Sequence, residues 1–431
     1  MKTLVLNDEL FWEWISSYDN LPDKGINTYL KALSANISGT DFISELLDYV
    51  DDQKTSSIMD NLSFGMPRKY FLEIQFCAST YARIFGTIFP PLASQVDQLA
   101  YIEWLLYTEP GYRGYRDHLV HMFKVAFVCD HLMAVRKLSD KLVKWQFESQ
   151  HFLRWCKNRR IAINKWMQTE KDEVARIAIF LAAIFHDFGY GYFFLRRYKE
   201  RLFKLYEWLL PGGDPTDIDS PSTQIILKSL PAFFVQDHHD WLSDVNAIIT
   251  DNVVTGFFHD SLPLNHSTSS SLFVLDVTEK LFKARALSEK LYVAFQLAAE
   301  AVMIHDMTGD NSWVHLKTKN NMHFLNCNEH KSVPLAMLLI LADELSVWNR
   351  ATLQMVSRGQ DEVGYQFNTQ DVPDKIEVRV TERKKQNRIE IKPNRGQENI
   401  KRTFYNNLKC LKNNSNQNRS KILEYSISVI S

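Results

Sequence analysis

The sequence predicts a mainly α protein with a large helical core and a small α+β region at its C-terminal end. Glycine and proline are scarce, with 15 and 13 among 431 residues, so the chain carries few obligatory helix breaks. From about Phe71 to Ser357, apolar residues recur three and four positions apart, as on the buried face of a helix. After about Gly359 apolar and polar residues alternate, which is typical of half-buried strands.

These patterns divide the chain into three regions. We expect a helical N-terminal region over residues 1–100, a core over residues 101–357 and a small α+β region over residues 358–431. Two polar breaks, PGGDPTDIDSP and HDSLPLNHSTSSS, bracket an insertion in the core at about residues 205–260. A chain that is 45% hydrophobic has enough apolar side chains to bury a substantial core.

The C-terminal region has its own order of elements. Alternation predicts strands at Lys375 to Val380 and Arg388 to Lys392, then a helix at Asn399 to Leu411 and a last strand at Ile422 to Ile430. From Asp374 onward there are 14 lysines and arginines against six acidic residues. A basic sheet face is usually only solvated, but a nucleic-acid contact through this region is an alternative.

Composition sets the expected compartment and partners. Lysine plus arginine (50) balances aspartate plus glutamate (51), so the net charge of -1 gives no reason to expect nucleic acid or membrane lipid as a partner of the whole chain. The five cysteines form no CxxC pair, the N-terminus lacks a signal-peptide apolar core, and the longest apolar stretch, Ile177 to Phe185, is too short to span a bilayer. We therefore expect a cytoplasmic protein with no membrane partner, and the sequence is compatible with an oligomer.

The most informative feature is the adjacent pair His186-Asp187. It ends the apolar run ARIAIFLAAIF and precedes the segment FGYG, whose glycines let the chain turn. An imidazole and a carboxylate at the end of a buried helix cost desolvation energy unless they pair or bind an ion. At a helix terminus, both side chains can reach the same ion.

Three other apolar helices are interrupted in the same way. His121 lies on the apolar stripe of its helix, and His118 lies one turn earlier. His305 closes the run LAAEAVMIH, and Asp343 follows eight apolar residues in PLAMLLILADEL. A single buried histidine is more often a satisfied core residue, but four helices that end or open on His or Asp together predict a metal site.

The donor types indicate the metal and its chemistry. Imidazole and carboxylate ligands without thiolates favour a divalent ion such as Mn, Fe, Mg, Co, Ni or Zn. We expect His121, His186-Asp187, His305 and Asp343 together to bind such an ion. An open site of this kind lowers the pKa of a bound water, and the resulting hydroxide attacks a phosphorus atom held in line. The residues therefore predict metal-assisted hydrolysis of a phosphoester.

The order His121, His186-Asp187, Asp343 resembles the H…HD…D signature of the HD-domain superfamily of metal-dependent phosphohydrolases. The similarity covers about Tyr101 to Ala351: RDHLVHMFKVA is similar to the first ligand helix of the family, AAIFHDFGYG to its HD turn, and LLILADELSVWNR to the segment with the last aspartate. The dipeptide alone means little, because it occurs four times in this chain. The resemblance implies an HD-type helical core, phosphohydrolase activity and one or two divalent metal ions. It also implies that His121, His186, Asp187 and Asp343 hold the principal ion.

Members of this family with two metals supply further histidines between the HD pair and the last aspartate. His266 opens a segment similar to the His-x-x-x-Ser helix opening of the family, and His305 follows about one helix later. The pair His238-His239 is a competing donor, but it falls in the expected insertion. We prefer His266 with His305, and the resemblance then implies that Asp187 bridges two ions.

Departures from the family patterns narrow the range of substrates to be expected. The dNTP triphosphohydrolases carry two histidines soon after the HD pair, where this chain has Tyr190 and Leu195. The GYP motif of the cyclic-di-GMP phosphodiesterases is also missing. By analogy with the family we expect a nucleotide or another small-molecule phosphoester as the substrate. The alternatives are a nucleotide-sensing regulatory module and an HD-type nuclease.

Catalysis on a phosphate group needs cations and proton donors beside the metal. We expect Asp187 at the centre of the reaction and Arg350 as the best phosphate contact, since it would lie two turns after Asp343 on the same helix. Arg116, just before the first ligand helix, is the next candidate. His118 is the candidate general acid or a further phosphate contact.

Overall fold

The computed structural model describes the helical core and the C-terminal sheet of the chain. The described residues are 2–16, 28–29, 32–33, 73–74, 76–78, 80–81, 84, 118–148, 150–163, 166–189, 266–283, 287–305, 334–350, 352–357, 363–368, 372–383, 386–407, 420–422 and 425–430. The expected insertion at about residues 205–260 lies outside them.

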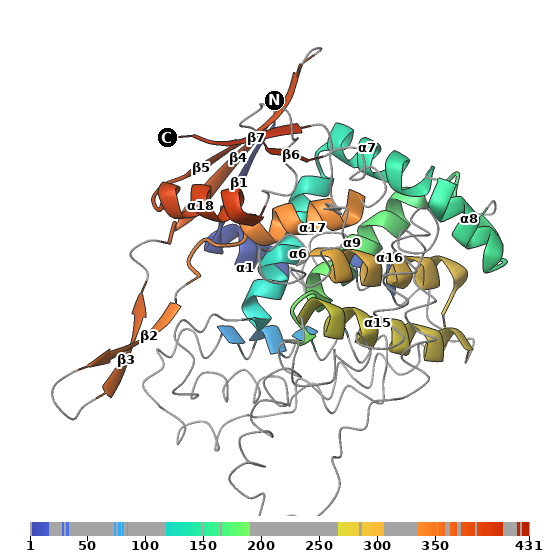
Figure 1. Cartoon of the computed structure of the whole chain (residues 1–431), viewed down its shortest axis with the longest axis horizontal. Helices are drawn as coiled ribbons and strands as arrows, with labels where there is room; N and C mark the ends of the chain where they lie inside the picture. The colour runs from blue at the N-terminus through green and yellow to red at the C-terminus, as the bar shows by residue number, and fades with distance from the viewer. Residues whose placement is uncertain are drawn as a thin grey trace, which may run out of the picture.

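Five helices form the core of the molecule (Figure 1). They are α6 (Leu119–Met133), α9 (Lys171–Phe185), α15 (His266–Lys283), α16 (Glu289–His305) and α17 (Pro334–Leu345). Helix α9 is central, because it contacts each of the other four. Its residues from Val174 to Phe185 are buried on every side apart from Arg176, as expected of a helix that is apolar all round.

The other helices in the described part of the chain lie around this core. They are α1 (Asp8–Ser16), α7 (Arg136–Phe147), α8 (Gln150–Asn158) and α18 (Gln397–Asn407). Helix α7 buries Leu138, Leu142 and Val143, which recur at helical spacing, and leaves its charged residues outside. No helix in the described part of the chain is long and apolar enough to cross a membrane.

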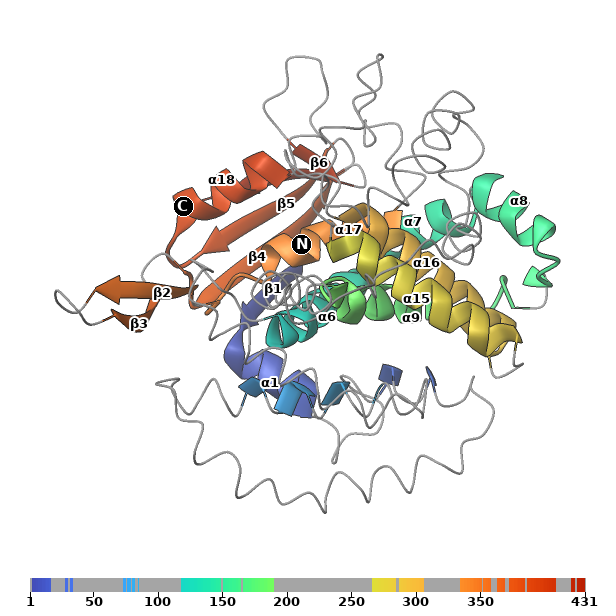
Figure 2. The same ribbon diagram turned by 60° about the horizontal axis from the view of Figure 1, so that its bottom comes forward.

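A five-stranded sheet in the order β1-β4-β5-β7-β6 packs beside the helices (Figure 2). Its strands are β1 (Lys2–Asn7), β4 (Lys375–Arg383), β5 (Gln386–Pro393), β6 (Ser420–Ile422) and β7 (Tyr425–Val429). β1 pairs antiparallel with β4, so that Leu6 lies opposite Ile376. Both side chains are fully buried and belong to the same hydrophobic core as the helices.

A separate two-stranded ribbon interrupts the chain between the helices and the sheet. It consists of β2 (Thr352–Ser357) and β3 (Val363–Asn368), which pair antiparallel. Figures 1 and 2 show the ribbon extending away from the helical core. Its base is closed by a hydrogen bond from the backbone N–H of Asn349 to the carbonyl oxygen of Pro373, 2.8 Å long.

The structure confirms a mainly α protein with a small C-terminal sheet, and it also corrects the expectation in places. The predicted strands at 375–380 and 388–392 lie within β4 and β5, and the predicted helix at 399–411 overlaps α18. The last strand is instead two short strands, β6 and β7. β2 occupies the end of the run that was expected to be mainly helical up to Ser357. Residues 2–7, also expected to be helical, form β1 because they complete the edge of the sheet beside β4.

Candidate metal centre

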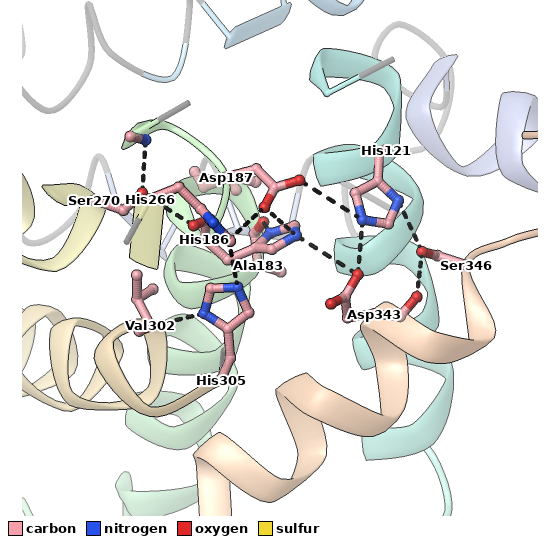
Figure 3. A network of polar contacts seen from close by, with 12 residues as sticks. His121, Ala183, His186, Asp187, His266, Ser270, Val302, His305, Asp343 and Ser346 are labelled. Atoms are coloured by element: carbon pink, nitrogen blue, oxygen red, sulfur yellow. Dashed lines mark hydrogen bonds and ion pairs between the residues drawn. The ribbon is translucent and has the colours of Figure 1, made fainter. Parts of the chain in front are cut away.

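The ends of five helices meet at one place, and each of them carries predicted metal-ligating side chains (Figure 3). These side chains are His121 in the first turn of α6, His186 and Asp187 just after α9, His266 at the start of α15, His305 at the end of α16, and Asp343 in the last turn of α17. All six predicted ligands therefore lie together. The competing pair His238-His239 lies outside the described residues.

Two overlapping triads have the spacing of a metal site. Donor atoms of His121, His186 and Asp343 lie within 4.8 Å of one another, and so do donor atoms of His186, Asp187 and His305. The shared member is His186, whose Nε2 lies 3.4 Å from Asp187 Oδ1 and 3.9 Å from Asp343 Oδ1. Ligands that bind one ion at about 2.0–2.2 Å stand at comparable distances from each other.

The carboxylate of Asp187 faces both sides of this cluster. Its Oδ2 lies 3.9 Å from His121 Nε2, whereas its Oδ1 lies 3.4 Å from His266 Nε2. His266 in turn has its Nε2 atom 3.3 Å from His305 Nε2. Asp187 therefore lies between the His121 side and the His266 side, as a bridging carboxylate would.

Hydrogen bonds at the rear of two imidazole rings fix which nitrogen carries the proton. His186 Nδ1 lies 2.7 Å from the carbonyl oxygen of Ala183, and His305 Nδ1 lies 2.6 Å from that of Val302. A carbonyl oxygen can only accept, so Nδ1 carries the proton in both rings. In the neutral imidazole Nε2 then presents a lone pair to the site, which is the form that binds a metal ion.

His121 is fixed in the same tautomer by a serine. Ser346 donates its hydroxyl proton to the carbonyl oxygen of Asp343, at 2.8 Å, and therefore accepts from His121 Nδ1, at 2.9 Å. The unprotonated Nε2 of His121 then faces Asp343 Oδ1 at 2.8 Å. Two electron-rich atoms at this distance repel each other unless a cation lies against them. The guanidinium of Arg350 is one such cation, because its Nη1 donates to His121 Nε2 at 3.1 Å.

Burial and charge set the protonation of the cluster. Burial is the main reason that the pKa values of His121 and His266 fall to about 3. Burial alone would raise the pKa values of Asp187 and Asp343, but the neighbouring imidazoles outweigh it and hold both pKa values below the usual range. At neutral pH His121 and His266 are therefore neutral and the two carboxylates are ionised, which are the metal-binding forms.

The donor set fits a divalent cation. His186 is fully buried, and its Nε2 makes no hydrogen bond within the described part of the chain. A buried lone pair of this kind, beside two carboxylates, is costly unless an ion satisfies it. The absence of thiolate among the donors favours an ion that accepts nitrogen and oxygen ligands.

Arg350 reaches the site by a different path from the one predicted. Helix α17 ends at Leu345, so Arg350 does not lie two turns after Asp343 on the same helix, as expected. The chain instead turns through Ser346–Asn349, and Asn349 adopts a left-handed conformation with φ 50°. Arg350 Nη1 then lies 3.1 Å from His121 Nε2, so the predicted cation is nevertheless beside the cluster.

His118 lies at the edge of the cluster rather than within a triad. It immediately precedes α6, is 9% exposed, and is one of the neighbouring histidines that lower the pKa of Asp187. Arg116, Tyr190 and Leu195 lie outside the described residues.

Two supporting serines contribute to the site. Ser270, the serine of the predicted helix opening, accepts from the backbone N–H of Gly189 at 2.7 Å and donates to the carbonyl oxygen of His186 at 3.0 Å. Ser346 was missed by the sequence reasoning, because its partner His121 lies 225 positions away and no local pattern links them. Both serines hold ligand-bearing segments in place.

No protein-family model, curated protein or solved structure matches this chain.

Proposed function

We propose that this protein is a metal-dependent phosphohydrolase with an HD-type helical core, acting on a nucleotide or another small phosphoester. The observation that carries the proposal is the common orientation of His121, His186 and His305. Each ring has its Nδ1 proton engaged at the rear and its Nε2 turned into the cluster. The Nε2 atoms of His121 and His186 lie 2.8 Å from Asp343 Oδ1 and 3.4 Å from Asp187 Oδ1, and that of His305 lies 3.3 Å from His266 Nε2. This arrangement is costly without a cation and is suited to binding one.

The resemblance to the HD-domain superfamily suggests how the ligands divide between two metal ions. His121, His186, Asp187 and Asp343 would hold the principal ion, and His266 and His305 would complete a second site. A divalent ion bound there would supply Lewis acidity and lower the pKa of a bound water. The two-sided position of Asp187 supports two ions rather than one.

Residues of the chain itself would act on the phosphate. Arg350 provides a permanent positive charge beside the cluster, where it would bind a phosphoryl oxygen and stabilise the charge that develops on it. His118 would serve as a general acid or as a second phosphate contact from the start of α6. An anion-binding arginine beside a metal-activated water suits a phosphoester substrate.

The experiment is a metal and substrate screen with one inactivating variant. The full chain is stripped with a chelator, reloaded with Mn²⁺, Fe²⁺, Co²⁺, Ni²⁺, Mg²⁺ or Zn²⁺, and assayed for bound metal and for hydrolysis of nucleotides and phosphodiesters. Asp187→Ala should lower both bound metal and turnover, by at least about 1,000-fold in turnover, because it removes the carboxylate that faces both halves of the cluster.

His131→Gln is the matched control for this variant. His131 lies on α6 like His121 and has its Nδ1 atom 3.0 Å from the carbonyl oxygen of Phe127, but it belongs to neither triad. Its substitution should leave metal content and turnover unchanged. The proposal is wrong if Asp187→Ala binds metal and turns over substrate as the wild type does. Nucleotide binding without turnover would instead indicate a sensor, and release of nucleotides from single-stranded nucleic acid would indicate a nuclease.

A further inference from the structure

The carboxylate of Asp8, at the start of α1, bonds to the turn that follows α17. Its Oδ1 accepts a hydrogen bond from Trp348 Nε1 at 3.1 Å, and its Oδ2 accepts one from Asn349 Nδ2 at 2.9 Å. These partners lie 340 and 341 positions later in the chain. The N-terminal segment is therefore tied to the residues that immediately precede Arg350.

Lys124 connects the same carboxylate to the first ligand helix. It lies on α6 one turn after His121, is 4% exposed, and has its Nζ atom 3.3 Å from Asp8 Oδ1. The ammonium group also donates to the carbonyl oxygen of Trp348 at 3.0 Å. A buried ammonium is costly unless it is paired and hydrogen-bonded, so Asp8 and the turn together stabilise Lys124 in this position.

The backbone conformation of Asn349 makes the Ser346–Asn349 turn depend on hydrogen bonds from other segments. Its φ of 50° lies in the left-handed region, which costs a non-glycine residue free energy although asparagine tolerates it better than most. Its side chain is held by Asp8 and its backbone N–H by the carbonyl oxygen of Pro373. The following residue, Arg350, leaves the turn in the direction that brings Nη1 to 3.1 Å from His121 Nε2.

We propose that Asp8 is a positioning residue for the reaction, because it holds the Trp348–Arg350 turn so that the Arg350 guanidinium enters the metal centre and binds a phosphoryl oxygen of the substrate. The inference rests on the proposed phosphohydrolase function. It gives the N-terminal segment a role in the proposed reaction, although Asp8 is not one of the predicted metal ligands. Its effect on the reaction passes through Arg350.

The test is a double-mutant cycle on the full, Mn²⁺-loaded protein. Arg350→Ala should lower kcat/KM by about 100-fold, and Asp8→Asn by about tenfold, since a displaced guanidinium binds the phosphate less well. In the Arg350→Ala background, Asp8→Asn should change kcat/KM by less than about twofold, because the residue through which it acts is gone. Asp8→Asn should also weaken inhibition by orthophosphate, while bound Mn²⁺ stays unchanged.

Asn349→Gly is a second variant, in which Lys124 keeps its ion pair with Asp8. Glycine keeps the left-handed backbone at no steric cost but removes the bond to Asp8, so it should reproduce the loss in kcat/KM and in orthophosphate affinity. Asp130→Asn is the control, because Asp130 accepts from Trp14 Nε1 at 2.9 Å and so also ties α1 to α6, but does not contact the Arg350 turn. It should lower the Tm and leave kcat/KM unchanged.

The outcomes separate this inference from the proposed function. A wild type that binds no metal and hydrolyses no phosphoester removes the proposed function, and the role of Asp8 in it falls as well. An active wild type whose Asp8→Asn and Asn349→Gly variants match it in kcat/KM and orthophosphate inhibition removes the role of Asp8 alone. Equal losses from Asp8→Asn with and without Arg350 would also overturn it, because the effect would then not pass through Arg350.

Discussion

At the scale of single residues, the protonation of the histidines is the property that decides what the site can bind. His121, His186 and His305 each present the same ring nitrogen to the cluster, and a hydrogen bond at the rear of the ring imposes this choice. Two of these bonds go to carbonyl oxygens of the same helix three positions earlier, so they follow from local structure. The bond of His121 depends on Ser346, from a distant segment.

Removing the hydroxyl of Ser346 should therefore weaken metal binding. Ser346→Ala leaves His121 Nδ1 without its acceptor, so the ring loses its fixed tautomer and orientation. We expect Mn²⁺ affinity to fall by about 10–100-fold, as measured by isothermal titration calorimetry. Ser426→Ala, which removes a hydroxyl that donates to Asn387 in the sheet, should bind Mn²⁺ as the wild type does. Unchanged affinity in Ser346→Ala would argue against a ligand role for His121.

At the scale of secondary-structure elements, the centre depends on the meeting of helix ends. α6 and α15 contribute their first turns, α9, α16 and α17 contribute their last turns or the residues just beyond them, and α9 contacts the other four helices. Because helix ends carry backbone groups without partners inside the helix, they need hydrogen bonds from elsewhere. Ser270 provides such bonds at the end of α9, where it contacts both His186 and Gly189.

A pair of adjacent serines on α15 tests whether this contact shapes the metal centre. Ser270→Ala removes the bonds to the turn after α9, whereas Ser271→Ala removes a bond to the carbonyl oxygen of Ala299 on α16. Both hydroxyls are buried, so each variant should lose about 1–3 kcal/mol of unfolding free energy in denaturant titrations. Only Ser270→Ala should also weaken Mn²⁺ binding. Equal metal affinities in the two variants would contradict a supporting role for Ser270.

At the scale of the whole molecule, the two ends of the described chain come together in one sheet. Figure 1 shows both termini at this sheet, where β1 forms one edge beside β4. The segment that follows β1 then reaches the core through α1 and Asp8. The sheet and the helical core are thus linked by the N-terminal segment as well as by the chain between α17 and β4.

The contribution of β1 can be measured with two neighbouring residues. Leu6 is fully buried opposite Ile376, whereas Val5 lies on the other face of the strand and is half-buried. Leu6→Ala should lower the free energy of unfolding by about 2–5 kcal/mol because it leaves a cavity in the core. Val5→Ala should cost less than about 1 kcal/mol. Equal effects in urea titrations would show that β1 does not bury its inner face in solution.

The sequence was most informative about the residues of the candidate metal centre. His121, His186-Asp187, His305 and Asp343 each end or open an apolar helix, and this pattern is visible because a buried polar group must have a partner. His266 was instead expected from the family resemblance. The helical periodicity of the core and the alternation in β4 and β5 could also be predicted, since both follow from local burial. The sequence by itself therefore determined the mainly α class, the main strands and the six residues that meet.

Only the tertiary structure decided how these residues are oriented and what supports them. The partner of His121 lies 225 positions away, and the carboxylate that holds the turn before Arg350 lies 341 positions from Asn349. β1 is a strand because β4 offers it an edge, although its flanking sequence favoured helix. Contacts between distant segments produce no periodic pattern of apolar residues in the sequence, since they are fixed by packing rather than by local burial.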